Sequence, residues 1–265
     1  MQAAVKGVCI MVLCGAMTAA NAFTSHDLRS FGYEVRDFVA DFAFINFNVF
    51  SKETLLVGAV AAPLWAGTYQ IDDPIHRCFY DDSCHRNEIE CRASKMLFIE
   101  DAGIAVPLLA VSGYAWASRD YETRLLGRNL FAGIIAVAIA KDAIKDSFEG
   151  TICQRPYSGW FPKKCAYGGF PSGHAATLTY ATILCALRKG PAWALPVGMY
   201  TGVVIASLLV NNYHYASQIV AGAGLGAIFA VAAHKVIDFR LDDRLHINAG
   251  ITPNGVPGVS FSYSF

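Results

Sequence analysis

Long apolar runs separated by short polar segments constrain this chain more than any other feature. The run Thr54–Ile71 contains no charged residue and is long enough to cross a bilayer at a tilt. Small residues crowd the last run, which favours close contact between helices in lipid. The six runs are Thr54–Ile71, Met96–Ala117, Leu130–Ala140, Ala175–Leu187, Trp193–Val210 and Ala216–Phe239. The sequence therefore predicts an all-α bundle of six transmembrane helices, with a soluble all-α domain that buries the same helices as the alternative.

Composition supports a membrane protein and excludes other classes. Hydrophobic residues make up 54% of the 265 residues and charged residues 16%, against about 45–50% and about 25% in soluble domains. Basic and acidic residues both number 21, so the formal net charge is zero. Low charge with high hydrophobicity excludes intrinsic disorder. The balance also argues against a nucleic-acid partner, because such proteins carry a basic excess.

The N-terminus has the features of a targeting segment. Lys6 precedes an apolar run, and Ala20-Asn21-Ala22 fits the small-x-small cleavage rule. We expect residues 1–22 to be a signal peptide, with an uncleaved first helix as the alternative. Residues 23–53 combine phenylalanines with acidic residues, which predicts an amphipathic or additional membrane segment.

The C-terminal tail, residues 240–265, follows the predicted core at 54–239. Pro253-Asn254-Gly255 forms a turn signal between two segments in which apolar and polar residues alternate. This pattern predicts a short β-hairpin.

Five of the eight cysteines lie in two loops that helix parity places on one face of the bundle. Such clustering indicates disulfides and an oxidising compartment, with reduced thiols as the alternative. The pairing cannot be read from the sequence. These cysteines are Cys78, Cys84, Cys91, Cys153 and Cys165.

Three polar clusters lie on the same face as these cysteines. They are Lys145 with Gln154-Arg155-Pro156, then Phe170–His174, then Asn211–Gln218. A helix that begins near His174 offers free N–H groups to an anion, and Lys145 and Arg155 add positive charge. Two histidines beside an anion can act as nucleophile and general acid. The chemistry that fits is phosphoryl transfer through a phosphohistidine, without metal or cofactor.

The order of these clusters resembles that of the type 2 phosphatidic acid phosphatase superfamily. That family carries Lys-x6-Arg-Pro, then Pro-Ser-Gly-His, then Ser-Arg-x5-His-x3-Asp. Pro171-Ser172-Gly173-His174 matches the second motif completely, and Ser207–Gly226 looks like the third motif with the glycine-rich helix behind it. The resemblance extends over roughly residues 54–239.

The resemblance implies a role for each matching residue. His174 would be the general acid and His214 the nucleophile, with Gln218 in the position of the orienting residue. The residues that would bind the substrate phosphate are Lys145, Arg155, Ser172, Gly173 and Ser207.

Three departures from the family pattern weaken the implied site. Leu208 occupies the position of the third-motif arginine and cannot bind phosphate. Gln218 occupies the position of the aspartate, so it can accept a hydrogen bond from His214 but supplies no charge. Phe148 stands where the lysine is expected; Lys145 lies three residues earlier, and Lys141 is a poorer candidate. A carboxylate from Asp142, Asp146 or Glu149 could replace the missing charge if it folded close to His214.

Two classes of function follow. The first is a membrane phosphatase, a phosphoric monoester hydrolase that acts on a lipid phosphate or pyrophosphate. The second is a catalytically weakened relative that binds a phosphorylated lipid or has a structural role in the membrane. A soluble exported acid phosphatase of the same superfamily is a third reading. We expect a bacterial-type inner (cell) membrane location with the site facing the periplasm or exterior; the oligomeric state cannot be predicted.

Overall fold

The computed structural model describes residues 25–79, 100–148, 169–210, 213–242, 245–251 and 257–263. The predicted signal peptide, 1–22, lies outside the described residues.

A helix forms over each of the six apolar runs. They are α3 (Lys52–Gln70), α6 (Glu100–Trp116), α7 (Tyr121–Ser147), α8 (Gly173–Lys189), α9 (Pro191–Val210) and α10 (Ala216–Leu241). Helix α2 (Ser25–Asn48) lies in the stretch for which the sequence predicts an amphipathic or additional membrane segment, whereas helix α4 (Asp72–Phe79) was not predicted. The described part of the chain therefore holds eight helices, and the predicted six-helix count is not confirmed. Helix α7 begins well before its apolar run because the Asp120 carboxylate caps its first turn, accepting from Thr123 N at 2.9 Å.

Three of these helices, α7, α9 and α10, are long and apolar enough to cross a membrane. Helices α2 and α3 are bent by 55° relative to one another, and this broken pair would make a fourth span. Length and composition therefore support three or four spans among the described residues, fewer than the six transmembrane helices predicted.

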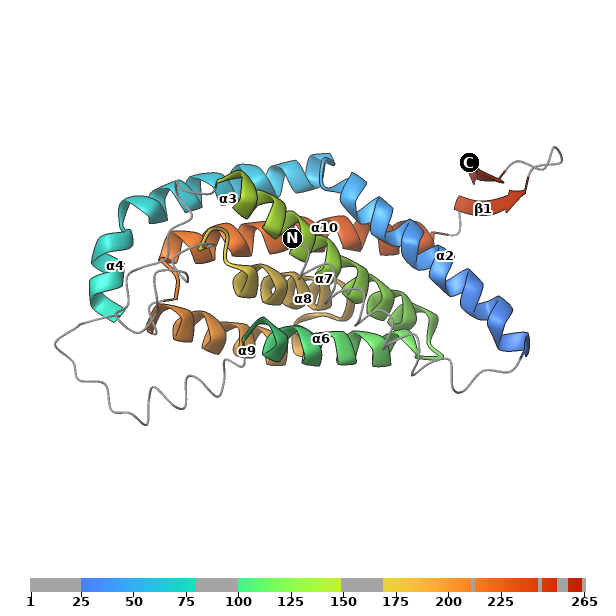
Figure 1. Ribbon diagram of the computed structural model, residues 1–265, viewed down its shortest axis with the longest axis horizontal. Coiled ribbons are helices and arrows are strands. Elements are labelled where there is room, and N and C mark those ends of the chain that lie inside the picture. The colour runs from blue at the N-terminus through green and yellow to red at the C-terminus, as the bar shows by residue number, and fades with distance from the viewer. Residues whose placement is uncertain are drawn as a thin grey trace.

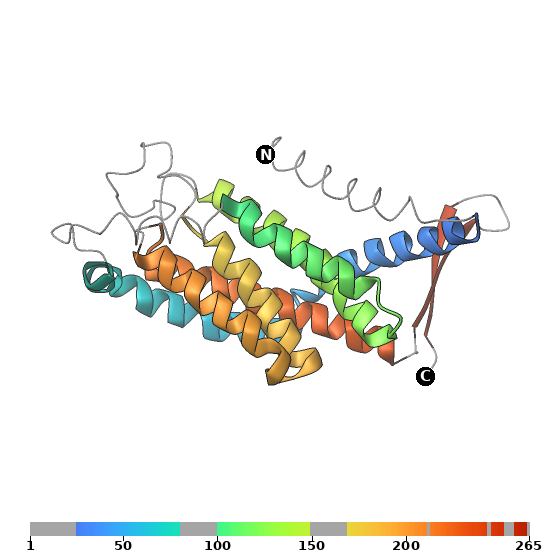
Figure 2. The ribbon, with the colours of Figure 1, turned by 90° about the horizontal axis from the view of Figure 1, so that it is seen from below.

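Helix α8 lies at the centre of the bundle, between α7, α9 and α10 (Figures 1 and 2). Helix α10 packs along α8 on one side and along α3 on another. Gly222 and Gly226 make this approach possible, because a Cβ at either position would lie within 2.4 Å of a backbone oxygen of the α8 segment, 2.3 Å from Ser172 O and 2.2 Å from Ala176 O. The run of small residues in the sequence therefore corresponds to the closest helix crossing in the site region.

Helix α2 does not present its acidic side to solvent. Asp41 is fully buried and contacts Arg128 of α7 and Arg240 of α10, with Arg128 Nε at 2.7 Å and Arg240 Nε at 2.9 Å from its carboxylate oxygens. The most buried acidic residue of α2 therefore contacts two other helices, while the expectation of an amphipathic or additional membrane segment at 23–53 stays a prediction.

The C-terminal tail forms a two-stranded antiparallel sheet where the sequence predicts a hairpin. Strand β1 (Leu245–Ile251) pairs with β2 (Pro257–Tyr263), with Leu245 opposite Tyr263 and Ile251 opposite Pro257. The strands project beyond the C-terminal end of α10 (Figure 1). They lie at the end of the bundle opposite to His214, which directly precedes α10.

Candidate active site

The third motif occupies the connection from α9 to α10. The carbonyl of Leu208, in the last turn of α9, accepts hydrogen bonds from the backbone N–H groups of Tyr213 at 2.9 Å and His214 at 3.4 Å. These bonds hold the connection against the end of α9. The His214 side chain is only 2% exposed, so its ring has a fixed environment at the start of α10.

Gln218, in the first turn of α10, fixes the orientation and tautomer of His214. Its Oε1 lies 3.2 Å from Tyr215 N and 3.1 Å from His214 Nδ1. A backbone N–H only donates, so the atom that faces it must be the amide oxygen. An oxygen only accepts, and His214 Nδ1 must therefore carry a proton. In the neutral ring this leaves the lone pair on Nε2, which is the atom available for attack.

The second motif forms the start of α8, as the sequence predicts. Ser172 is fully buried and caps the helix, with its Oγ accepting from Ala175 N at 3.4 Å. Gly173 is the first residue of the helix and His174 the second. A phosphate at this end would meet the free N–H groups and the positive end of the helix dipole.

A backbone hydrogen bond joins the second and third motifs. Ser172 N donates to Gln218 O at 3.0 Å, so the residue that caps α8 is held by the residue that orients His214. Gly222, one turn further along α10, touches the Ser172 carbonyl. The Phe170 ring fixes the other side of this loop through contacts with Trp65 at 5.6 Å and Phe148 at 5.9 Å between ring centroids. The structure therefore brings His174 and His214 to the same end of the bundle.

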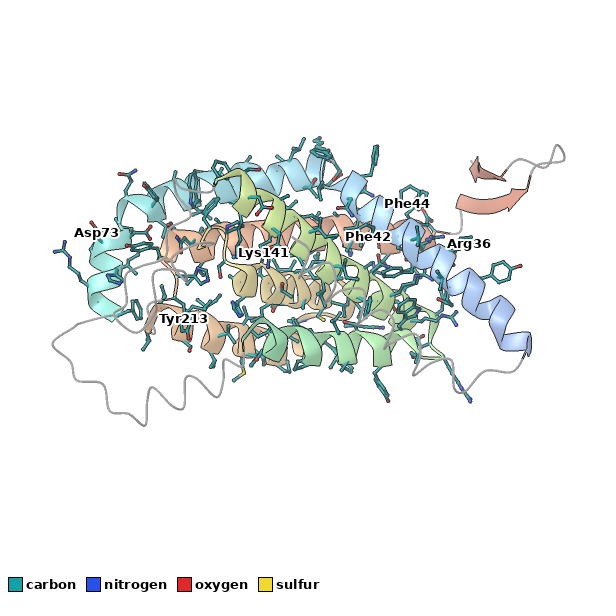
Figure 3. The ribbon with its side chains drawn as sticks, in the orientation of Figure 1. Arg36, Phe42, Phe44, Asp73, Lys141 and Tyr213 are labelled. Carbon is teal, nitrogen blue, oxygen red and sulfur yellow. The ribbon has the colours of Figure 1, made fainter. Side chains whose placement is uncertain are left out.

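The lysine that lies against the second motif is Lys141 (Figure 3). A Cβ added to Gly173 would lie 2.6 Å from Lys141 Cδ and 3.4 Å from Nζ, so a larger residue at this position would displace the Lys141 side chain. Lys141 Nζ also pairs with Asp142 at 3.1 Å. Lys145, which the motif spacing favours, lies one turn further along α7 and is partly buried. The structure thus places Lys141, the poorer candidate of the sequence analysis, beside Gly173 of the second motif.

Leu208 belongs to the apolar core and not to a phosphate site. It is fully buried in a cluster with Ile104, Ala175, Leu178, Val204 and Ile219. Ser207, the preceding residue, is partly buried. The position that holds arginine in the family motif is therefore occupied by a side chain that packs α9 against α8 and α10.

Asp72, the first residue of α4, is a carboxylate at this site that sequence reasoning missed. It is 8% exposed and accepts from Ser217 N at 2.9 Å and from Ser217 Oγ. Of the replacements considered from sequence, Asp142 pairs with Lys141, Asp146 is exposed and Glu149 lies outside the described residues. The available signal for Asp72 was an Asp-Asp pair directly after an apolar run, on the face that carries the motifs.

The carboxylates of α4 also act on Tyr215, between His214 and α10. Burial raises the pKa of the Tyr215 hydroxyl, and the negative charges of Asp73 and Asp72 raise it further. The ring of His76, also on α4, lies 5.6 Å from that of Tyr215. Helix α4 therefore covers the beginning of α10 with negative charge.

Several predicted residues fall outside the described part of the chain. These are Arg155 and the cysteines at 84, 91, 153 and 165. Cys78 and Cys185 are described and are free, so the disulfides predicted for this face are not seen among the described residues. Those residues also include no group of three or more histidine, cysteine or acidic side chains that could hold a metal ion.

The described chain is a bundle of apolar helices in which the segments that carry His174 and His214 lie at one end and are joined by a backbone hydrogen bond. Residues 126–242, which span most of α7 through α10, match the model of the PAP2 superfamily. The resemblance drawn from the motifs is thus confirmed over these residues.

A solved structure supports the same fold. The chain is similar to the crystal structure of a transmembrane PAP2-type phosphatidylglycerolphosphate phosphatase from Bacillus subtilis, with a TM-score of 0.51 and 13% sequence identity. The match covers 71% of this chain and 96% of the other. At this identity the similarity concerns the fold alone. No curated protein matches the sequence.

Proposed function

We propose that the protein is a membrane phosphatase that hydrolyses a lipid phosphate or pyrophosphate through a phosphohistidine on His214. The observation that supports this most directly is the hydrogen-bond pair on Gln218 Oε1. It keeps a buried histidine in the tautomer whose Nε2 can attack phosphorus, although the family's aspartate is absent.

In the first step, His214 Nε2 forms a bond to phosphorus and the bond from phosphorus to the lipid oxygen breaks. His174, in the first turn of α8, gives its proton to the leaving oxygen. In the second step, water loses a proton to His174 and attacks phosphorus, and the N–P bond breaks to return neutral His214 and inorganic phosphate.

The phosphate would be bound at the start of α8. Ser172 and the backbone of Gly173 in the first turn offer hydrogen bonds, and Lys141 offers positive charge beside them. We assign to Lys145, Arg155 and Ser207 the supporting phosphate contacts that the family resemblance implies. Leu208 contributes none, so we expect weaker transition-state stabilisation than in a site with a second arginine.

The first experiment measures phosphate release by the purified protein in detergent, with a chelator present, from phosphatidic acid, phosphatidylglycerol phosphate and an isoprenyl pyrophosphate. We expect release from at least one substrate, loss of release in His214→Ala, and a radiolabelled enzyme intermediate that is stable to base and labile to acid. His234→Ala is the matched control, because His234 lies towards the other end of α10. No release from any substrate would contradict the proposal and would favour the lipid-binding role.

A second experiment separates the two lysines. We expect Lys141→Met to raise KM and lower kcat/KM by about tenfold to a hundredfold, since a charge-assisted phosphate contact contributes about 1.5–3 kcal/mol. Lys145→Met should have a smaller effect, because Lys145 lies one turn further from Gly173 along α7. Equal losses, or the larger loss in Lys145→Met, would contradict the assignment of Lys141.

Orientation is tested at Cys78, which is exposed on α4 at the same end as His214. We propose that this end faces the periplasm or exterior of a bacterial-type inner membrane. A membrane-impermeant maleimide added to intact spheroplasts should then label Cys78, and Cys78→Ser should reduce the labelling relative to wild type. Labelling only after lysis would place the site on the cytoplasmic side.

A further inference from the structure

Asp72 is a buried carboxylate that accepts two hydrogen bonds from one residue of another helix, Ser217 of α10. It stands at the first position of α4, and its oxygens accept from the backbone N–H and the hydroxyl of Ser217 in α10. Ser217 is itself only 3% exposed. A buried charge of this kind is retained only where it is paired or hydrogen-bonded, and here its hydrogen bonds tie it to one turn of α10.

That turn is also the one that holds His214. Ser217 directly precedes Gln218, whose Oε1 contacts the imidazole Nδ1. Two acceptors therefore meet the first turn of α10. The neutral amide oxygen of Gln218 contacts the His214 ring, and the Asp72 carboxylate of α4 contacts the adjacent Ser217. Figure 1 shows α4 at the end where α10 begins, and Figure 3, in the same orientation, shows Asp73 of α4 and Tyr213 of the connection at that end.

Gln218, as a neutral acceptor, cannot stabilise the positive charge that the reaction places on the His214 ring. When an imidazole attacks phosphorus with Nδ1 protonated, positive charge develops on the ring, and a nearby negative charge stabilises it. Gln218 orients His214 but supplies no charge. In the family motif a single aspartate would do both.

We propose that Asp72 supplies from α4 the negative charge that Gln218 lacks, so that orientation and charge at His214 come from two residues on two helices. This inference rests on the proposed function, and it makes Asp72 a positioning and electrostatic residue that does not touch the substrate. The influence of Asp72 and Asp73 on Tyr215, the neighbour of His214, shows that charge on α4 acts on this connection.

The test moves the charge from one helix to the other. Asp72→Asn removes the charge and keeps one side-chain acceptor for Ser217 N, while its NH2 group can donate to Ser217 Oγ in place of the second acceptor oxygen. We expect kcat to fall by about tenfold or more, with KM changed by less than about twofold because the phosphate contacts on α8 are untouched. Adding Gln218→Glu to Asp72→Asn places a carboxylate beside His214 Nδ1, and we expect it to recover most of the lost kcat. Asp146→Asn, an exposed carboxylate near the end of α7, controls for a general effect of surface charge.

Two results would overturn the inference. One is an unchanged kcat in Asp72→Asn. The other is a loss of kcat that follows a fall in thermal stability and is not recovered by Gln218→Glu, since that outcome would assign Asp72 a structural role alone.

A separate measurement keeps the inference testable if the wild type releases no phosphate, an outcome that would contradict the proposed function by itself. The imidazole pKa of His214 is followed by NMR of histidine-labelled protein in micelles, with His214→Ala to assign the signal. If Asp72 acts by charge, Asp72→Asn should lower this pKa by about half a unit or more. An unchanged pKa would overturn the inference whatever the activity.

Discussion

The backbone and the side chain of Leu208 have different roles at the candidate active site. Its carbonyl holds the backbone of Tyr213 and His214, so the chain path of the third motif is intact. Its side chain fills a core position between α9, α8 and α10. Sequence comparison alone treats this position as a lost phosphate ligand. The structure shows that the leucine at this position is part of the hydrophobic core.

This leads to a prediction for Leu208→Arg, the substitution that would restore the arginine of the family motif. Leu208→Arg should destabilise the protein by about 3 kcal/mol or more, because it places an unpaired guanidinium in an apolar cluster. Leu208→Met should cost less than about 1.5 kcal/mol, since it conserves the volume of the side chain. Unfolding in detergent followed by circular dichroism measures both variants. A stable and more active Leu208→Arg would show that the core can open to let the arginine reach the phosphate.

At the scale of the elements, the site depends on how closely α8 and α10 approach. Ser172 N donates to Gln218 O, and Gly222 leaves room for the Ser172 carbonyl. The N-terminal ends of both helices are thereby fixed to each other, and these ends carry His174 and His214. The geometry of the site is thus a consequence of backbone contact between two helices.

Gly222→Ala should therefore disturb the site as well as the packing. The new Cβ would lie 2.3 Å from Ser172 O, so the helices must separate, at a cost of about 1–3 kcal/mol. We expect lower thermal stability together with a loss of kcat. The matched control is Gly202→Ala in α9, where a Cβ meets nothing within 4 Å. Equal effects of the two substitutions would contradict the proposed role of the close approach.

The start of α7 gives a prediction for pH. The Thr123 hydroxyl and backbone N–H donate to the Asp120 carboxylate, and these hydrogen bonds lower its pKa. The folded state therefore favours the charged form. Its contribution to stability is fully present above the ordinary pKa of an aspartate, about 4, and is lost as the pH falls through the lowered value. The stability difference between wild type and Asp120→Asn should shrink over that range, and a difference that stays constant with pH would contradict this.

At the scale of the whole molecule, the two ends of the bundle differ in kind. The end with His214 gathers the motif residues, whereas the opposite end is held by ion pairs between helices. Arg128 of α7 is almost fully buried and contacts Asp41 as well as Glu34 and Asp37 of α2, at 3.2 and 3.5 Å. Arg188, at the end of α8, pairs with Glu122 and Asp238 of its neighbours. The ionic end therefore anchors α2 and closes the bundle on the side away from the chemistry.

Removing the central carboxylate should loosen this end. Asp41→Ala leaves the buried Arg128 and the partly buried Arg240 without their shared partner, which we expect to cost about 3–5 kcal/mol. Glu34→Ala is the control, because Glu34 is about one-third exposed (35% for its side chain) and should contribute much less. Thermal unfolding of the two variants in the same detergent compares them. Equal losses would show that the network does not depend on its buried member.

The sequence by itself determined the features that depend on neighbours along the chain. The apolar runs located the helices, Ser172 marked the start of α8, and a local turn signal marked the tail where two strands pair. The order of Pro171–His174 and His214 led to the resemblance that the family model supports over residues 126–242.

Only the tertiary structure decided which side chains from different helices meet. It placed Lys141 beside Gly173, Asp72 on Ser217, Leu208 in the core and Asp41 between two arginines. Each of these contacts joins residues far apart in the chain. They depend on the crossing and rotation of helices, which are set by the shape of whole packed faces and not by spacing along one segment.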